Sequence, residues 1–186
     1  MTKAVFGLGN PGLPYALTRH NIGFEVIDLY RKVRRSRTKG RIEGSALVYS
    51  ISGLLLVKPM TYMNESGLAV RAVLEKYQVE PADALVVYDD LDLELARIRI
   101  LSSGGAGSHK GMQSVIRALG TEDIPRLRIG IETDSRQESG RDYVLDRFST
   151  NEWKQVLPAI RSAVEAIDVF CGRGIDEAMT RFNRWE

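Results

Sequence analysis

Close to its start the chain reads Lys3-Ala4-Val5-Phe6-Gly7-Leu8-Gly9-Asn10-Pro11-Gly12. The apolar residues predict a first β-strand. The glycines predict a turn in which the backbone can come close to a ligand, because glycine has no Cβ. Thr18-Arg19-His20-Asn21 follows, and His20 is one of only two histidines in the chain. Since histidine exchanges protons near neutral pH, this segment predicts the mouth of an active site at the end of the first strand.

The same stretch also matches a dinucleotide-binding pattern, Gly7-x-Gly9-x-x-Gly12. That pattern requires a helix that begins inside the glycine loop, so that its N-terminus meets a pyrophosphate. Pro11 and Pro14 fall where this helix would start, and together they favour an irregular loop. The sequence therefore argues against a nicotinamide or flavin site.

Apolar and amphipathic runs alternate along the rest of the chain, an order typical of an α/β fold with helices on the faces of a sheet. Ile51-Ser52-Gly53 predicts a hairpin turn, so we expect a mixed twisted β-sheet flanked by helices. With 186 residues and no repeat or linker, residues 1–186 are expected to form a single catalytic domain. The predicted strands are Ala4–Leu8, Ala46–Ser50, Leu54–Val57, Ala84–Tyr88, Arg97–Leu101 and Leu127–Ile131, and the predicted helices are Asn21–Val33, Ser66–Tyr77, Lys110–Leu119, Asn151–Phe170 and Ile175–Phe182.

Composition narrows the class of protein. The formal net charge of +2 does not by itself predict a nucleic-acid partner. The basic run Lys32–Arg41 contains no acid and fits either a solvated loop or an edge that contacts phosphates. A single cysteine, Cys171, excludes an internal disulfide and suits a reducing compartment. Without a membrane-length apolar run, or room for a signal peptide before the first strand, we expect a cytoplasmic protein that binds no membrane.

Polar residues cluster where predicted strands end, and in open α/β sheets ligands gather beyond the carboxyl ends of the strands. A histidine base held by a carboxylate can take a proton from water, while asparagine amides hold a carbonyl group. This combination suits direct attack of water on an activated ester. The four clusters are Asn10 with His20, Met63-Asn64, Asp89-Asp90-Leu91-Asp92, and the glycine loop Ser102–Ser108 with His109.

A metal ion bound by the Asp89, Asp90 and Asp92 run is the weaker alternative. Two histidines and one distant cysteine make a poor zinc set, so neither a metal nor a cofactor is expected.

Each candidate residue also has a purely structural interpretation. His20 could cap the following helix, Asn10 could occupy a left-handed turn position, and Asn64 could cap the helix that starts at Ser66. Asp90 and Asp92 are expected to be solvated or turn-forming. Asp89 directly follows Val86-Val87-Tyr88, and its side chain could reach a histidine of the first loop.

Several motifs follow one another along nearly the whole chain: Gly7–Gly12, Tyr15, Thr18–Gly23, Lys58–Gly67, Asp89–Leu93, Gly104–His109, Arg126–Ile131 and Tyr143-Val144-Leu145. In these motifs, and in their order and spacing, the chain resembles bacterial peptidyl-tRNA hydrolases. The resemblance implies a monomeric α/β enzyme that cleaves the ester between a peptide and the 3′ end of tRNA without a cofactor.

The resemblance also implies a role for individual residues. His20 would activate water, Asp89 would orient His20, and Asn10 would hold the ester end of the substrate. Met63 and Asn64 would line the peptide groove, with His109 on its far wall. Tyr15 would pack near the terminal adenosine, and Arg128 would grip the 5′-phosphate of the tRNA.

Two positions depart from the family pattern. Lys110 stands where related chains usually carry an asparagine, and it offers donors but no acceptor for a water molecule. Leu101 stands where they usually carry a basic residue. We hypothesise that Lys110 or Arg99 partly replaces the charge lost at Leu101. Because of Lys110, a non-catalytic RNA-binding relative of the same fold stays as the alternative function.

Overall fold

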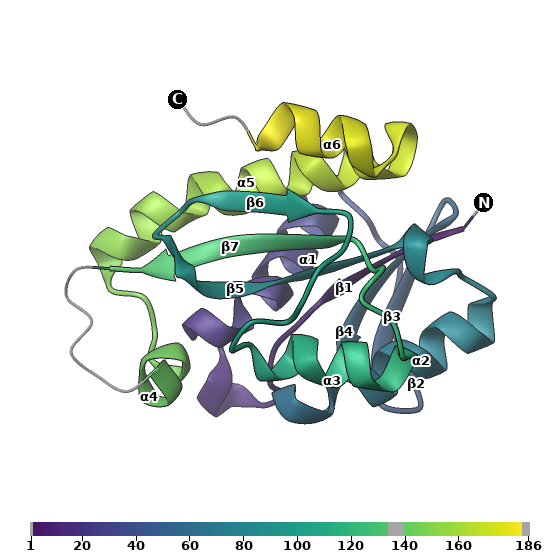
Figure 1. Cartoon of the computed structure of the whole chain (residues 1–186), viewed down its shortest axis with the longest axis horizontal. Helices are drawn as coiled ribbons and strands as arrows, with labels where there is room; N and C mark the ends of the chain where they lie inside the picture. The colour runs from purple at the N-terminus through teal and green to yellow at the C-terminus, as the bar shows by residue number, and fades with distance from the viewer. Residues whose placement is uncertain (1, 134–139, 184–186) are drawn as a thin grey trace.

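A seven-stranded sheet forms the centre of the computed structural model, which describes residues 2–133 and 140–183 (Figure 1). The strands are β1 (Lys3–Gly7), β2 (Arg41–Glu43), β3 (Ala46–Ile51), β4 (Leu54–Pro59), β5 (Ala84–Glu94), β6 (Ile98–Leu101) and β7 (Arg126–Glu132). Their order is β2-β3-β4-β1-β5-β7-β6. β4, β1, β5 and β7 run parallel, whereas β2, β3 and β6 are antiparallel to their neighbours. The predicted mixed sheet and the hairpin between β3 and β4 are confirmed.

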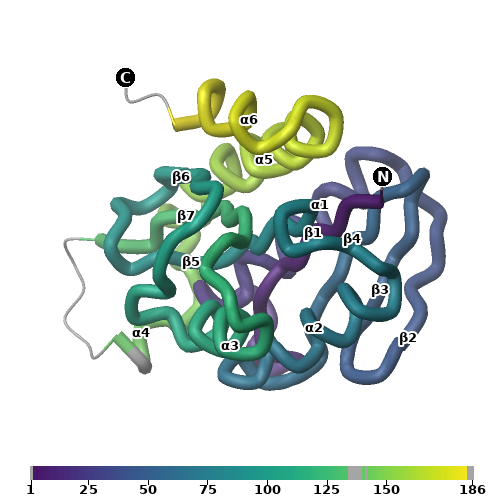
Figure 2. Tube along the Cα trace, turned by 45° about the vertical axis from the view of Figure 1, so that its right-hand side comes forward, coloured from purple at the N-terminus to yellow at the C-terminus, as the bar shows by residue number. Residues whose placement is uncertain are grey.

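Helices cover both faces of this sheet (Figures 1 and 2). β1 shows why, because its side chains alternate: Val5 packs among α1 and α5, while Ala4 and Phe6 pack on the opposite side with α2 and α3. α6 extends the α5 layer. The helices are α1 (Ile22–Val33), α2 (Ser66–Tyr77), α3 (Lys110–Leu119), α4 (Gly140–Leu145), α5 (Thr150–Arg173) and α6 (Ile175–Phe182).

Three features differ from the sequence-based expectations. β2 and α4 are short elements that periodicity did not predict. β5 does not end at Tyr88 but continues to Glu94, so the Asp89–Asp92 run lies within the strand rather than after it. Pairing between β5 and β7 continues to Glu94, with a register shift between Asp90 and Glu94.

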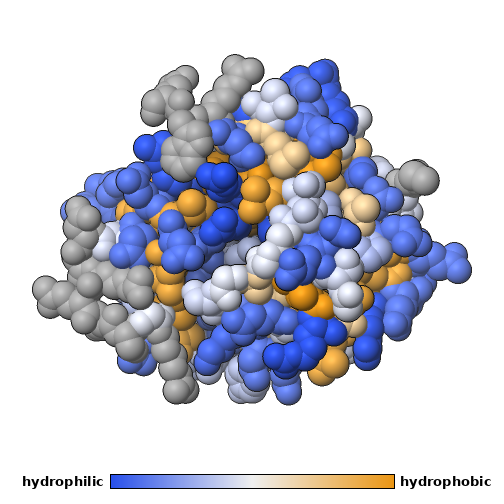
Figure 3. Space-filling view, viewed as in Figure 1, coloured by the Kyte–Doolittle hydropathy of each residue, from blue (hydrophilic) through white to orange (hydrophobic). Residues whose placement is uncertain are grey.

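One face of the molecule is mostly polar. In the view of Figure 3, polar residues predominate and apolar residues form separate small patches. Among the described residues, no helix is long and apolar enough to cross a bilayer.

Two glycines bring α1 unusually close to the sheet. A Cβ on Gly23 would lie 2.4 Å from the Leu8 nitrogen and 2.5 Å from the Val87 oxygen, and a Cβ on Gly7 would lie 2.1 Å from the Gly23 oxygen. All of these neighbours are backbone atoms, which cannot rotate away. The 3₁₀ turn Arg19–Asn21, which carries His20, directly precedes α1. The glycine contact therefore fixes His20 beyond the end of β1 and beside Asp89 of β5.

Replacement of Gly23 by alanine should lower the free energy of unfolding by about 1–3 kcal/mol or more, because the methyl group overlaps backbone atoms. Urea denaturation measures this. Gly172→Ala is the matched control: Gly172 lies in helix α5 with nothing within 4 Å of the added Cβ. This control should gain about 0.5–1 kcal/mol. Equal stabilities of the two variants would contradict the close approach of α1.

Candidate active site

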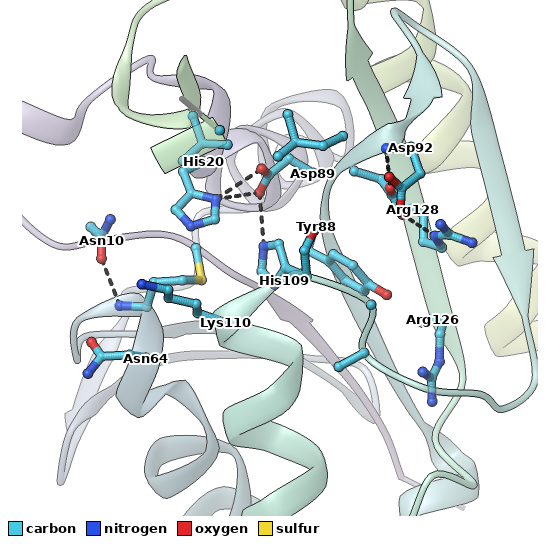
Figure 4. A pocket seen from close by; sticks show the side chains of 18 of the residues that line it. Asn10, His20, Asn64, Tyr88, Asp89, Asp92, His109, Lys110, Arg126 and Arg128 are labelled. Atoms are coloured by element: carbon cyan, nitrogen blue, oxygen red, sulfur yellow. Dashed lines mark hydrogen bonds and ion pairs between the residues drawn. The ribbon is translucent and has the colours of Figure 1, made fainter. Parts of the chain in front are cut away.

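A pocket of about 910 Å³ opens at the carboxyl ends of β1 and β4 and along β5 (Figure 4). Of the catalytic and binding residues predicted from the sequence, Arg99 is the one that does not line this pocket. The others come together from five separate segments of the chain: Asn10, Tyr15, His20, Met63, Asn64, Asp89, His109, Lys110 and Arg128.

His20 and Asp89 form the central pair. His20 Nδ1 lies 2.8 Å from Asp89 Oδ1 and 2.9 Å from Oδ2, and Asp89 is only 1% exposed. Because a carboxylate can only accept, Nδ1 carries the proton and donates it, which leaves the Nε2 lone pair available as a base. No side-chain cap bond is recorded at the start of α1, so the interpretation of His20 as a helix cap is wrong.

The same carboxylate binds the second histidine. His109 is the N-cap of α3, and its Nδ1 accepts a hydrogen bond from the Met112 backbone at 3.1 Å. Nε2 therefore carries the proton of the neutral ring and donates it to Asp89 Oδ1, 3.1 Å away. The rings of His20 and His109 meet edge to face, with centroids 4.9 Å apart. Beyond lining the pocket, His109 thus shares the Asp89 carboxylate with His20.

Burial and hydrogen bonding set the charges of this triad. Burial raises the pKa of the Asp89 carboxyl, but the imidazoles of His20 and His109 and their hydrogen bonds outweigh burial and hold the pKa below its usual range. Burial lowers the pKa of His109 more than the neighbouring Asp89 raises it. The site at neutral pH therefore contains an ionised Asp89 and a neutral His109.

Asn10 is held by bonds on three of its groups. Its backbone nitrogen donates to Asn21 Oδ1 at 2.8 Å, and Asn21 Nδ2 donates back to the Asn10 carbonyl at 2.9 Å. Asn10 Oδ1 accepts from the Met63 backbone at 2.7 Å. Asn10 has no positive φ, so the left-handed turn interpretation is wrong. The bond to Met63 uses the side-chain oxygen, so Nδ2 is the side-chain donor that Asn10 can offer to a ligand in the pocket.

The residues at the rim of the pocket are more exposed than Asn10. Asn64 lines the pocket and does not cap α2, whose N-cap is Glu65. Lys110 is the first residue of α3, and Figure 4 shows its side chain on the side of Asn10 and Asn64. Tyr15 meets the exposed Tyr62 edge to face, with ring centroids 6.3 Å apart, at the rim of the pocket.

Arginines define the other end of the pocket. Arg128 forms an ion pair with Asp90, whose second oxygen accepts from the Asp92 backbone at 2.8 Å. Of the two alternatives expected for Asp90, solvated or turn-forming, the structure confirms the second, because its side chain accepts the Asp92 bond and is buried against Arg128. Arg99 lies opposite Arg128 in the β6–β7 register but outside the pocket lining.

The Asp89–Asp92 run does not form one ligand set for a metal, because Asp89 faces the histidines while Asp90 binds Arg128. Within the described ranges, the ligand atoms of His20, Asp89 and His109 do lie within 4.8 Å of one another. Their contacts of 2.8–3.1 Å are hydrogen bonds, so a metal ion there would have to displace both imidazole protons.

Two arginines that the sequence did not single out position the pocket walls. Arg126 is fully buried and donates to the backbone oxygens of Gly104, Gly105 (3.0 Å), Glu122 (2.8 Å) and Ile124 (3.0 Å). It therefore holds the glycine loop in place. The sequence signal that could have indicated Arg126 is its spacing two residues before Arg128, which places both arginines on one face of the strand.

Arg19 ties the α4 wall to the histidine turn. Its guanidinium donates to Glu152 at 2.8 Å and to the Arg147 oxygen at 3.1 Å, and lies 4.1 Å from the centre of the Tyr143 ring. The Arg19 backbone nitrogen donates to the Asp146 oxygen at 3.0 Å. Because α4 contributes Val144 and Leu145 to the pocket, Arg19 fixes this wall beside His20.

Asp89→Asn should lower kcat by roughly 10³–10⁴-fold, because the amide can no longer fix the tautomer of His20. Hydrolysis of an N-blocked aminoacyl ester substrate provides the measurement. Asp92→Asn, an exposed neighbour that also lines the pocket, is the control and should keep most of the rate. If Asp89→Asn behaves like this control, the pair does not act in catalysis.

Comparisons with known proteins agree with this geometry. A family model described as peptidyl-tRNA hydrolase matches residues 4–186. A peptidyl-tRNA hydrolase of Desulforudis audaxviator is 44% identical, covering 98% of this chain and 94% of the relative. One of Staphylococcus aureus is 42% identical, covering 97% of each. The crystal structure of the Acinetobacter baumannii enzyme superposes with a TM-score of 0.89 at 30% identity, covering 100% of this chain and 96% of that one.

Proposed function

Because the chain belongs to the peptidyl-tRNA hydrolase family and hydrolyses peptidyl-tRNA, we propose that His20 Nε2 is the general base of this reaction. The observation that carries the proposal is the bond of His20 Nδ1 to both oxygens of Asp89 at the edge of the pocket. Nε2 takes a proton from water, and the resulting hydroxide attacks the ester carbonyl. The proton then passes to the departing 3′ oxygen of the tRNA.

Asp89 and His109 support this proton transfer. The ionised carboxylate stabilises the imidazolium that forms on His20 and keeps its ring oriented. His109 is kept neutral by burial and by its cap bond to Met112, so it donates to Asp89 without taking the proton itself. Asn10 Nδ2 faces the ester carbonyl and stabilises the negative charge that develops on its oxygen.

The peptide and the terminal adenosine occupy neighbouring parts of the pocket in this proposal, because Tyr62, which packs on Tyr15, directly precedes Met63 and Asn64. Met63, Asn64 and Lys110 contact the peptide end, since Figure 4 places Asn64 and Lys110 beside Asn10. Tyr15 packs against the adenosine, supported by the edge of Tyr62. Lys110 offers its ammonium group to a carbonyl oxygen.

Arg128 binds the 5′-phosphate, with Asp90 holding its guanidinium in place. Figure 4 shows Lys110 and Arg128 on opposite sides of His109. Of the two residues expected to offset Leu101, Arg99 is therefore better placed, because it lies opposite Arg128 in the sheet.

The whole chain acts as one catalytic unit in this proposal. Every group assigned to the reaction comes from one copy, so a monomer suffices. No metal takes part in this proposal, because Asp89 is already satisfied by hydrogen bonds from His20 Nδ1 and His109 Nε2. We place the reaction in the cytoplasm, where tRNA is recycled. No observation favours the alternative of a non-catalytic RNA-binding relative, since the base, its carboxylate and the asparagine are all in place.

His20→Ala should lower kcat on N-acetyl-aminoacyl-tRNA by roughly 10²–10⁴-fold, because the general base is lost, while KM changes little. Release of free tRNA measures the rate. The wild-type rate should be the same with and without EDTA. A variant that keeps most of its rate would remove His20 from the mechanism, and loss of wild-type turnover with EDTA would introduce a metal.

Arg128→Ala should raise KM for full-length substrate by about tenfold, the factor expected when a charge-assisted hydrogen bond worth about 1.5 kcal/mol is lost. For an aminoacylated fragment of the 3′ end, which has no 5′-phosphate, KM should stay constant. Arg128→Lys retains the charge and should fall between. Equal effects on both substrates would show that Arg128 does not bind the distant phosphate.

A further inference from the structure

The basic run of the sequence covers the last turn of α1, the surface loop that follows and the first residue of β2. Residues 31–41, called here the basic loop, contain seven basic residues and no acid, whereas the rest of the chain has 19 basic and 24 acidic residues. Without this loop the protein would carry a net negative charge. A protein whose substrate is RNA thus concentrates its excess positive charge in eleven residues.

The pocket itself offers little net attraction to a polyanion. Arg128 is paired with Asp90, and Arg126 is committed to backbone oxygens. The charged residues lining the pocket balance one another, three basic against three acidic: Lys110, Arg126 and Arg128 against Asp89, Asp90 and Asp92. Attraction of RNA at long range must therefore come from charges outside the pocket.

Specific contacts hold the basic loop in shape. The guanidinium of Arg31 stacks 3.6 Å from the centre of the Tyr49 ring and donates to the Thr38 oxygen at 3.2 Å. The Ser36 nitrogen donates to the Arg31 oxygen at 3.0 Å, and Gly40 packs closely on Tyr49. Arg31 thus stabilises the conformation of the basic loop, and the other basic side chains extend from a backbone that these contacts hold.

Most of these cations have no acidic partner. Arg34 pairs with Asp168, but no ion pair within the described ranges joins an acid to the remaining exposed cations. Basic residues near the end of a helix interact favourably with its dipole, which accounts for Lys32 and Arg34 in and beside the last turn of α1. It does not account for the cations beyond that turn. The charge of Arg41 acts on the Glu43 carboxylate, so in the part of the chain that the structure describes the cations without an acidic partner are Lys32, Arg35, Arg37 and Lys39.

We propose that the basic loop is a second RNA-contacting surface, which binds phosphate backbone outside the catalytic pocket. α1 begins next to His20 and its twelve residues span about 18 Å, so the loop lies a helix length away from the base. It leads into β2 at one edge of the sheet, whereas Arg128 lies on β7, beside the other edge strand. The loop therefore meets RNA that the acceptor end in the pocket does not cover, either the body of the same tRNA or another RNA.

The proposal rests on RNA as the substrate. Its test distinguishes failure of this second RNA contact from failure of the proposed catalytic function. The variant carries Lys32→Gln, Arg35→Gln, Arg37→Gln and Lys39→Gln. The control carries the same charge change on exposed helix positions elsewhere: Arg117→Gln, Lys154→Gln, Arg161→Gln and Arg173→Gln. The probe is tRNA trimmed of its 3′-terminal CCA, which cannot fill the pocket, and binding is followed by fluorescence anisotropy between about 50 and 200 mM salt.

The variant should bind trimmed tRNA at least about tenfold more weakly, and the slope of log K against log salt should fall by about 3, since each lost phosphate contact removes about 0.7–0.9. The control should change neither value. Equal losses in both would show a general effect of net charge and overturn the proposal. Unchanged binding of trimmed tRNA by the variant would also overturn the proposal. So would a variant that loses binding to phosphatidylglycerol vesicles but still binds trimmed tRNA normally.

Turnover distinguishes the two sources of phosphate. If KM rises for full-length peptidyl-tRNA but not for the aminoacylated 3′-end fragment, the loop binds the body of the substrate. If KM is unchanged for both while binding of trimmed tRNA is lost, the loop binds a second RNA. Normal turnover of the fragment by the variant shows that the fold and the proposed catalytic site are intact.

Discussion

The site depends on one buried negative charge. Asp89 is almost completely inaccessible, and an isolated carboxylate in such a place is costly, so it must be met by donors. Two imidazole N–H groups supply them, one from the turn before α1 and one from the start of α3. Because each ring must present its proton to Asp89, the buried charge dictates the tautomers of both histidines. It leaves the Nε2 atom of His20 as the free basic nitrogen.

The fold brings these groups together by several independent contacts. Gly7 and Gly23 let α1 approach the backbone of the sheet, and this close approach determines the position of His20 relative to β5. The cap bond from Met112 orients His109. Alternation along β5 then separates two tasks, because Asp89 serves the histidines while Asp90 holds Arg128. In the proposed mechanism, proton transfer and phosphate binding are therefore arranged by neighbouring residues of one strand.

Much of this arrangement could be predicted from the sequence, and the reason is local. The glycine turn and His20 follow β1, and Asp89 comes directly after the apolar run of the neighbouring parallel strand β5, so the His20–Asp89 pair could be predicted. His109 follows β6, which runs antiparallel to β7, so the direction of the strands did not predict its contact with Asp89. Contacts between distant segments were not. The ion pair between Asp90 and Arg128 spans 38 positions and depends on the β5–β7 register, which no pattern in the sequence determines. Arg19 and Arg126 bind mostly backbone oxygens, and side-chain composition gives no signal for such partners.

The measurement that tests this account most directly is the protonation of the two histidine rings by ¹⁵N NMR near neutral pH. The chain contains only His20 and His109, so the spectrum of the wild-type protein holds two imidazoles. The account predicts opposite tautomers: His20 protonated at Nδ1 with a free Nε2, and His109 protonated at Nε2 with a free Nδ1. The same tautomer in both rings, or a doubly protonated His109, would contradict a single carboxylate that orients both.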